Sequence, residues 1–404
     1  MISSNYYKKF KIIFSVYLSS LLIICIFQLY HKHTGGADST MSEWFINYQG
    51  GFTKRGIVGE ISFIIANLTN SDLRFIIFLF QISLVFLYFL SIYNFIYKLD
   101  INYYILLIIF SPIFLLYPIA ELEVLARKEL FIFIGYIFFL NLCLNKKKKY
   151  YLLFLILILP LLSLIWEPVI FFTPFFLIPL IFKYSIYEKL KLLKLFPFFL
   201  PFILISLFIA LNPISDENHL KMAKALANNF GEKCYMSCAL LKSKSGIIDQ
   251  FTYNVPHYSI EIIIRYLLIF LIGFGPLLIM AKISSIKSKI LLFNLFENLL
   301  YPFLFMVSPL LLLFAMGSDW GRWINITYNF AVIFFIFLLK DNSIKINYIY
   351  LDNLLKKTKG YVLVVFFIIF CFSWNPKTNL TEDVASLPGY RIPYNFIKLI
   401  YNYF

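Results

Sequence analysis

The chain has 404 residues, of which 61% are hydrophobic and only 14% are charged, and its formal net charge is +15. A soluble globular domain is closer to half apolar and a quarter charged, so this composition excludes an ordinary soluble fold and indicates a membrane protein. In a soluble chain the basic excess would suggest nucleic acid. In a membrane protein it is typical of loops that face the cytoplasm, so we expect no nucleic-acid partner.

Apolar segments near the length needed to cross a bilayer, roughly 20 residues, follow one another along the sequence. The first lacks a clear small-residue cleavage site, so we expect it to be retained rather than removed as a signal peptide. We predict an all-α, polytopic integral membrane protein with about 11 transmembrane helices, forming a single transmembrane domain over residues 1–404. The expected spans are 11–30, 73–97, 102–119, 130–145, 151–166, 169–183, 195–211, 259–281, 290–316, 324–339 and 360–374.

The loops between these spans alternate in charge. One set is rich in lysine, and the other set holds nearly all the carboxylates. By the positive-inside rule the lysine-rich loops face the cytoplasm. An odd number of spans then places the N-terminus in the cytoplasm and the C-terminus in the periplasm, and we expect a multi-pass protein of the bacterial inner membrane.

Three longer segments are expected on the outer side. Residues 31–72 form the first outer loop, in which apolar residues recur at helical spacing over Ile57–Leu68 and predict a short helix lying in the membrane interface. Residues 212–258 form a second long loop. The C-terminal tail, 375–404, is amphipathic near Tyr394–Phe404 and is expected to lie on the same surface.

The five cysteines predict one structural feature. Cys234 and Cys238 share the second long outer loop, and an oxidising compartment favours a disulfide between them. The other three cysteines lie alone in apolar spans. The four histidines are scattered, so the sequence does not predict a zinc site.

The first outer loop carries two carboxylates, Asp38 and Glu43, close to the membrane surface. A carboxylate here can act as general base toward a hydroxyl group, or it can ligate a divalent cation such as Mg²⁺ or Mn²⁺. Lys54 and Arg55 follow a glycine pair, and their charged donors suit phosphate. A solvated loop is the alternative, but charges are costly to hold at the ends of membrane helices, which favours a functional role.

The second outer loop is very short and places five charges in nine residues, which are Glu121, Glu123, Arg127, Lys128 and Glu129. If the segment is helical, Glu123 and Arg127 lie four apart on one face and can form an ion pair. Side chains that reach to the interface from helix ends are the alternative.

Two further outer turns are charged. Glu167 occupies the third turn, where it either stabilises the start of the next helix or belongs to a site. Asp319 and Arg322 lie three apart in the fifth turn between two tryptophans, which are typical of an aromatic belt. They form either a private salt bridge or a site in which Arg322 holds a lipid diphosphate.

We expect these residues to meet in one lipid-accessible pocket, where the cations stabilise a leaving diphosphate. The candidate catalytic residues are Asp38 and Glu43. The candidate substrate-binding residues are Lys54, Arg55, Glu121, Glu123, Arg127, Lys128, Glu167, Asp319 and Arg322.

This arrangement resembles the GT-C superfamily of integral membrane glycosyltransferases. The resemblance covers the first third of the chain, with an N-terminal span, a long outer loop that carries an acidic pair, and an interfacial helix. It implies a polyprenyl-phosphate-linked sugar donor, a glycan or lipid-linked acceptor, and a base at Asp38 or, second, Glu43. Four residues separate these acids here, whereas many members carry adjacent or near-adjacent ones.

Other classes remain open. A repeat-unit polymerase for O-antigen or capsule shares the size, the number of spans, a sizeable outer loop and the outer arginines. A lipid-linked-sugar flippase or transporter is expected to hold ionisable groups near the bilayer midplane, whereas these span centres are nearly free of charge. An accessory subunit would leave the outer charges without a role.

Overall fold

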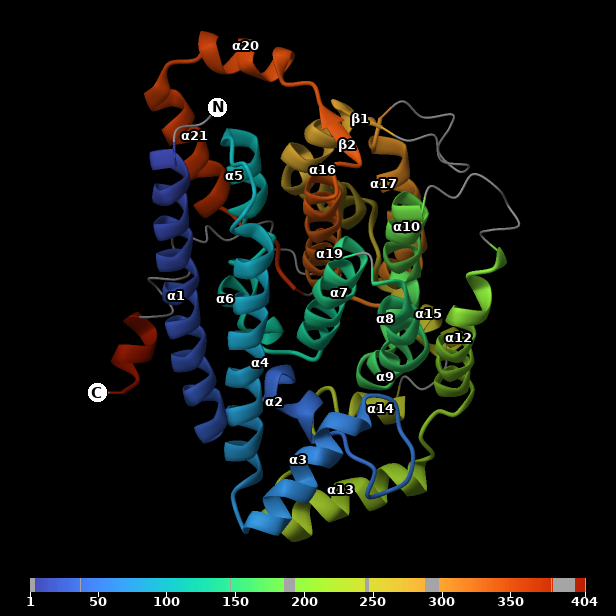
Figure 1. The fold of residues 1–404 in the computed structure, drawn as a ribbon. Helices are drawn as coiled ribbons and strands as arrows, with labels where there is room; N and C mark the ends of the chain where they lie inside the picture. The colour runs from blue at the N-terminus through green and yellow to red at the C-terminus, as the bar shows by residue number, and fades with distance from the viewer. Residues whose placement is uncertain are drawn as a thin grey trace.

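The computed structural model describes residues 4–36, 38–145, 147–184, 193–243, 247–287, 298–378, 380 and 397–403. These residues are mostly helical, and the only strands among them form one antiparallel pair, so the all-α prediction is confirmed (Figure 1). The helical form follows from the apolar sequence, because a chain surrounded by lipid must satisfy its backbone hydrogen bonds internally.

Five helical segments in the described part of the chain are long and apolar enough to cross a membrane. A sixth is added if α12 (Phe196–Leu211) and α13 (Asp216–Phe230), which meet at 94°, count as one span. These lengths support a membrane protein and do not confirm 11 spans. The five are Lys9–Gly35 in α1 (Ser4–Gly35), α4 (Leu73–Ile96), Lys148–Ile165 formed by α8, η3 and α9 (Lys148–Leu153, Phe154–Ile158 and Leu159–Ile165), α16 (Ile260–Lys282) and α19 (Trp320–Lys340).

Most of the other predicted spans are shorter helices. They are α7 (Glu129–Leu144), α10 (Thr173–Tyr184), α17, η6 and α18 (Leu300–Val307, Ser308–Leu310 and Leu311–Met316), and α21 (Gly360–Phe372). The beginning of the predicted span 290–316 lies outside the described residues, as do 381–396 of the tail.

The predicted helix over 102–119 is wrong in its middle. The helix α5 (Tyr103–Ile109) ends before Pro112, turns follow, and α6 is only Tyr117–Ala120. Proline lacks an amide hydrogen and clashes with the preceding turn, so it breaks the helix. The side-chain amide of Asn325 in α19 donates to the carbonyls of Ile113 and Phe114, at 2.9 and 3.1 Å, and so satisfies the exposed backbone.

The centre of the bundle is α19, in which every residue from Trp320 to Leu338 is buried. It packs against α7, α10 and α16. Its N-terminal residues lie beside the short helices at one end of the molecule, so a charge in its first turn is held inside the protein rather than in solvent.

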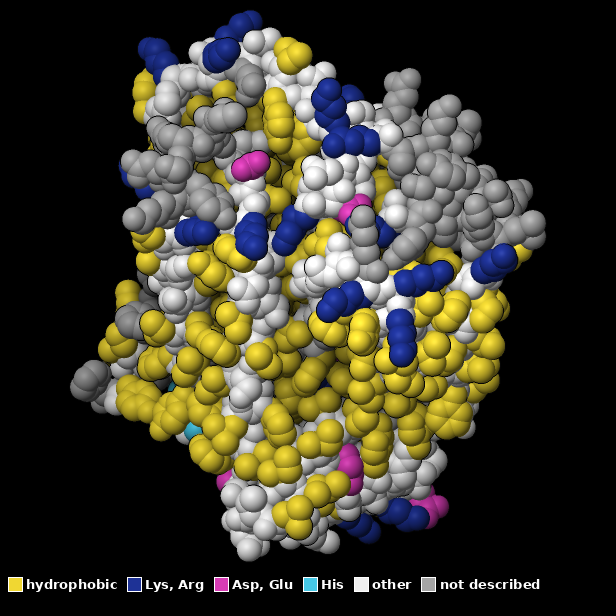
Figure 2. Space-filling model, viewed as in Figure 1, with side chains coloured by type: hydrophobic (Ala, Val, Ile, Leu, Met, Phe, Trp, Pro, Cys, Tyr) yellow, Lys and Arg dark blue, Asp and Glu magenta, His cyan; other side chains and the backbone are white. Residues whose placement is uncertain are grey.

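The two ends of the bundle differ (Figure 1). One end, here the α3 end, carries α2 (Ser39–Ser42), η1 (Glu43–Phe45), α3 (Gly56–Thr69), α13 and α14 (Leu240–Ser243). Helix α3 matches the helix predicted at Ile57–Leu68. The opposite end, the α20 end, carries the start of α1, the strands β1 (Ser284–Ile286) and β2 (Ile344–Ile346), and α20 (Ile349–Lys357). Lys and Arg side chains gather toward the α20 end, and apolar side chains cover the middle (Figure 2).

Candidate functional site

Glu43 is the centre of a buried ion-pair network at the α3 end. Its side chain is fully buried, and it accepts hydrogen bonds from Arg127 Nε at 2.8 Å and from an Arg55 amino group at 3.2 Å. An Arg322 amino group lies 4.0 Å away. Three arginines from separate segments therefore surround one carboxylate.

Three more carboxylates extend the network. Glu167, in η4 (Glu167–Phe172), accepts two hydrogen bonds of 2.7 Å from Arg55, and Lys54 lies 3.8 Å from it. Glu129 accepts two from Arg322, at 2.9 and 3.0 Å. Asp319 also pairs with Arg322 at 3.2 Å, so that salt bridge exists but is not private.

Left-handed backbone conformations position two of these arginines. Arg55 precedes α3 with a φ of 63°, and Ala126 precedes Arg127 with a φ of 51°. Such left-handed conformations cost of order 1–3 kcal/mol for residues other than glycine. Lys128 Nζ donates to the Arg55 carbonyl at 2.6 Å, and the Trp44 indole donates to the Ala126 carbonyl at 3.1 Å, which holds both turns in place.

The helix considered for Glu121–Glu129 is wrong. Only Leu122–Val124 (η2) is helical, in one 3₁₀ turn, and the left-handed Ala126 ends any continuation. Arg127 therefore points away from a shared helical face and pairs with Glu43, 84 residues earlier in the chain. Glu123 lines the neighbouring cavity described below.

The pKa values in the network follow from burial and neighbouring charge. Burial alone would raise the pKa of Glu43, but Arg127, Arg322, Arg55 and Lys128 together hold it well below its usual value. Burial lowers the pKa of Lys128 to about 7, because the attraction of Glu43 only partly offsets the loss of hydration. Glu43 is therefore a permanent anion here, whereas Lys128 titrates near neutral pH.

Asp38 lies outside this network. Asp38 caps α2 by accepting from the Thr40 amide at 3.0 Å, and it pairs with Lys32. Lys32 was not predicted, although it is a lysine on the otherwise acidic side of the first span. These groups line a separate hollow of the surface. A divalent cation shared by Asp38 and Glu43 is not favoured, because each acid already pairs with a cation.

Glu121 has a different partner again. It accepts hydrogen bonds from the Asn375 side chain at 3.0 Å and from the Thr378 amide and hydroxyl at 3.3 Å each. It therefore anchors the segment that follows α21. The sequence carries no local signal for Asn375 or Thr378, because the pairing spans more than 250 residues.

A polar cavity of about 290 Å³ opens beside the network. Charged residues from three segments line it, namely Lys54, Arg55, Glu123, Arg127, Asp319 and Arg322. The second long outer loop contributes Met236, Ser237 and Leu240 to its wall. The other predicted residues do not line it, namely Asp38, Glu43, Glu121, Lys128 and Glu167. The structure thus brings several of the predicted charged turns to one cavity, whereas the two predicted catalytic acids lie outside its lining.

A second cavity, of about 190 Å³, adjoins the first. The two share seven lining residues, which are Lys54, Arg55, Leu241, Gln250, Met316, Gly317 and Trp323. Beyond them the walls of the second cavity are mostly apolar and come from η4, α12 and α18, namely Ile170, Phe171, Ile209, Ala210 and Leu313. A charged compartment thus continues into an apolar one.

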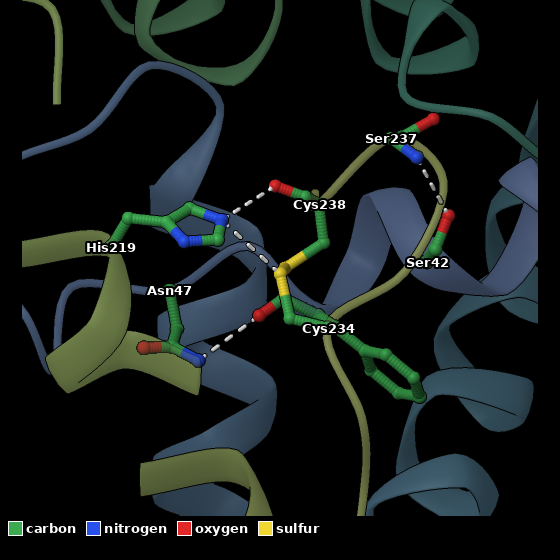
Figure 3. The surroundings of a disulfide bond; sticks show 7 residues. Ser42, Asn47, His219, Cys234, Ser237 and Cys238 are labelled. Atoms are coloured by element: carbon green, nitrogen blue, oxygen red, sulfur yellow. Dashed lines mark hydrogen bonds between the residues drawn. A yellow bond between two sulfur atoms is a disulfide. The ribbon is translucent and has the colours of Figure 1, made fainter. Parts of the chain in front are cut away.

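A disulfide between Cys234 and Cys238 closes the loop that carries Met236 and Ser237 (Figure 3). The Ser237 amide donates to Ser42 Oγ at 3.2 Å, which ties this loop to α2. His219 of α13 lies against the disulfide, 3.5 Å from Cys234 Sγ. In the described part of the chain these three residues are the only cluster with metal-ligand spacing, but both sulfurs are bonded to each other and are not available as thiolate ligands.

The glycine pair of the first outer loop serves a close approach. A side chain at Gly50 would meet the backbone of α13 at Asn218, and Gly51 has a φ of 110°. Both features require glycine. The first outer loop and the long loop 212–258 are thereby packed together at the α3 end.

No protein-family model matches this chain, and no curated protein or solved structure matches it either. The fold defines a helical protein of membrane character, and its site has to be interpreted from its own chemistry.

Proposed function

We propose that the protein is a membrane glycosyltransferase that acts at the α3 end, with a polyprenyl-phosphate-linked sugar as donor and a glycan or lipid-linked acceptor. The observation that carries this proposal is the polar cavity that continues into an apolar one. A lipid-linked sugar needs such a pair of compartments, because its phosphate and sugar are polar and its carrier is hydrocarbon.

The distribution of charge supports an outer position for the α3 end. The lysine-rich α20 end fits the cytoplasmic side of a bacterial inner membrane under the positive-inside rule. The α3 end then faces the periplasm, where a disulfide such as Cys234–Cys238 persists. The protein would act there in the assembly of a surface polysaccharide or glycoconjugate.

The cations of the cavity have a defined role in this proposal. Lys54 lines both compartments and lies too far from Glu167 for a hydrogen bond, so its ammonium group can turn toward a phosphate. Arg127 and Arg322 also line the polar compartment, where ion pairs with Glu43 and Glu129 hold them in place. Such preorganised cations stabilise the negative charge that develops on a leaving phosphate oxygen.

The carboxylates of the cavity supply the base. In the proposed step a carboxylate accepts the proton of the acceptor hydroxyl. At the same time the hydroxyl oxygen bonds to the anomeric carbon of the donor sugar, and the bond from that carbon to the carrier's phosphate oxygen breaks. Asp319 and Glu123 line the cavity, whereas Asp38 lies in the separate hollow with Lys32. Asp319 and Glu123 therefore replace Asp38 and Glu43 as the first candidates for the base.

The test is complementation of a strain that lacks the chromosomal copy. We expect the double variant Asp319→Asn with Glu123→Gln to insert in the membrane but to lose at least nine-tenths of the surface glycan and to accumulate polyprenyl-linked precursor. The matched control is Asp216→Asn, which removes an exposed acid on α13 and should behave as wild type.

The outcomes separate the alternatives. Full-length glycan in the double variant would exclude these carboxylates as the base. Unchanged glycan and unchanged lipid-linked intermediates in the deletion strain would exclude the glycosyltransferase itself. Glycan that carries a single repeat unit in the deletion strain would identify a polymerase instead, and precursor trapped on the cytoplasmic side would identify a flippase.

A further inference from the structure

A further cavity, separate from the two at the α3 end, lies near the α20 end. Its volume is about 400 Å³, and its lining is almost entirely apolar. The walls come from α5, α16 and α21, together with the end of α20 (Figure 1). The lining includes Leu107, Gly275, Leu355, Thr358, Leu363 and Phe366. We refer to it as the α5–α16–α21 groove.

The groove is open to the lipid side of the bundle. Its lining residues Leu271, Ile272 and Phe366 are each about half exposed, at 49%, 54% and 51%. A side chain at Gly275 would meet no atom within 4 Å, so this glycine borders empty space. Gly273, on the same helix, is different, because a side chain there would meet Ile113 at 2.6 Å. One glycine of α16 therefore faces the protein and the other faces the groove.

The shape of the groove suits a hydrocarbon chain. It is an open, apolar hollow of the surface rather than an enclosed cavity, and a single hydrocarbon chain is narrow enough to enter it. The charge around the groove, rather than its volume, therefore decides which occupant fits best.

The rim of the groove is basic. Lys356, Lys357 and Lys359 are exposed, and they alternate with Leu355 and Thr358, which line the groove. They belong to the last turn of α20 and to the residue that precedes α21. Helix α20 lies across the end of the bundle (Figure 1) and is amphipathic, as expected for a helix in a membrane interface. A cationic rim over an apolar groove matches a lipid with a negative head group.

We propose that the α5–α16–α21 groove binds one acyl chain of an anionic phospholipid from the leaflet around the α20 end, with the head-group phosphate held by Lys356, Lys357 and Lys359. This site is separate from the cavity at the α3 end and does not depend on the proposed function. The bound lipid would fix α20 in the interface and so hold the bundle at a set depth.

The test measures lipid binding to the purified full-length protein by native mass spectrometry. The probes are phosphatidylglycerol and phosphatidylcholine with identical acyl chains. We expect wild type to retain phosphatidylglycerol at least ten times more tightly than phosphatidylcholine. The triple variant Lys356→Gln, Lys357→Gln, Lys359→Gln should lose that preference. The control triple variant, Lys147→Gln, Lys148→Gln, Lys149→Gln, removes three consecutive exposed lysines that do not line the groove, and it should keep the preference.

A second variant tests the groove itself. Gly275→Leu adds a side chain into open space, so the fold should survive while phosphatidylglycerol binding weakens at least tenfold. Equal binding of the two lipids by wild type would overturn the proposal. Unchanged binding of phosphatidylglycerol by Gly275→Leu would also overturn it. If wild type is a dimer and Gly275→Leu is a monomer, the occupant of the groove is a second copy of the chain, and the proposal is again wrong.

Discussion

The two ends of this molecule differ in where most of their charged side chains lie, although the α20 end also holds a largely buried pair, Lys183–Asp341. At the α3 end the charges are buried and pair with residues distant in sequence, as in Arg127–Glu43, Arg55–Glu167 and Arg322–Glu129. At the α20 end the lysines at 356, 357 and 359 are exposed. Exposed lysines interact with water and lipid head groups and set orientation, whereas buried pairs fix the positions of chain segments. Exposed lysines therefore indicate topology, and buried ion pairs indicate a site.

The buried pairs have an energetic consequence. Removing a charge from water costs several kcal/mol, and partner charges repay that cost only when the geometry is good. Loss of one partner then leaves an uncompensated charge inside the protein. The comparison of the two ends therefore predicts large effects for substitutions at the α3 end and small effects for exposed charges.

The largest effect is expected for Glu43→Gln. Arg55 and Arg127 would lose an anionic acceptor, and Arg322 a neighbouring anion, so we expect a loss of about 3–5 kcal/mol in the free energy of unfolding. The measurement is thermal unfolding in detergent, where the midpoint should fall by several degrees. Glu217→Gln is the control, because its carboxylate pairs with Lys221 on an exposed face of α13 and should not shift the midpoint. Equal stability of Glu43→Gln and wild type would show that the buried network is not structural.

A smaller effect is expected for Arg322→Lys. The charge remains, but a lysine cannot make the two parallel hydrogen bonds to Glu129 and also reach Asp319. We expect a loss of about 1–3 kcal/mol in stability and at least a tenfold loss of glycan synthesis. Arg74→Lys is the matched comparison, because Arg74 makes the same kind of paired contact with Glu232 in a less buried setting. If the two variants lose equal stability, burial is not what distinguishes the α3-end network.

These variants also bear on what the sequence predicts. Hydropathy located the apolar segments and the helix α3, because those depend on local composition. Alternation of charge predicted that Arg55, Arg127 and Arg322 share one side, and the structure brings all three to Glu43. The pairing itself was not predictable: Arg127 turns to Glu43 only because Ala126 is left-handed, and no local pattern favours that conformation.

The other differences between the predicted and the observed structure vary in how far the sequence indicated them. Pro112 was visible within the predicted span 102–119, and only the support from Asn325 of α19 makes the break tolerable. The role of Asp38 as a helix cap follows from a turn that the sequence permits but does not require. The contact of Glu121 with Thr378 joins segments that no spacing rule connects.

The disulfide should have a moderate effect that is local to the cavity wall. The double variant Cys234→Ser with Cys238→Ser opens a short loop, for which chain entropy predicts a loss of about 2 kcal/mol. Met236 and Ser237 would lose their fixed position beside the cavity. The proposed glycan synthesis should therefore be affected more strongly than the free energy of unfolding. Wild type treated with a reductant should reproduce the variant. Full synthesis in the double variant would show that this loop does not shape the site.

The last effect concerns pH and tests whether Lys128 is buried as a charge. Its pKa is lowered by burial to about 7 in the folded protein, compared with about 10.4 in an unfolded chain. Between these values the unfolded state binds more protons than the folded state, so stability should rise with pH, by at most about 1.4 kcal/mol per pH unit. Below pH 7 both states are protonated, and the full cost of the buried charge is present.

The substitution Lys128→Met isolates that contribution. Methionine fills the same buried space without a charge but loses the hydrogen bond to the Arg55 carbonyl. The unfolding midpoints of wild type and variant, measured from pH 7 to pH 9 in the same detergent, should therefore diverge: wild type gains stability as pH rises, and Lys128→Met stays nearly flat. Parallel curves would show that Lys128 is solvated like the lysines of the α20 end, and the contrast between the two ends would then not extend to this residue.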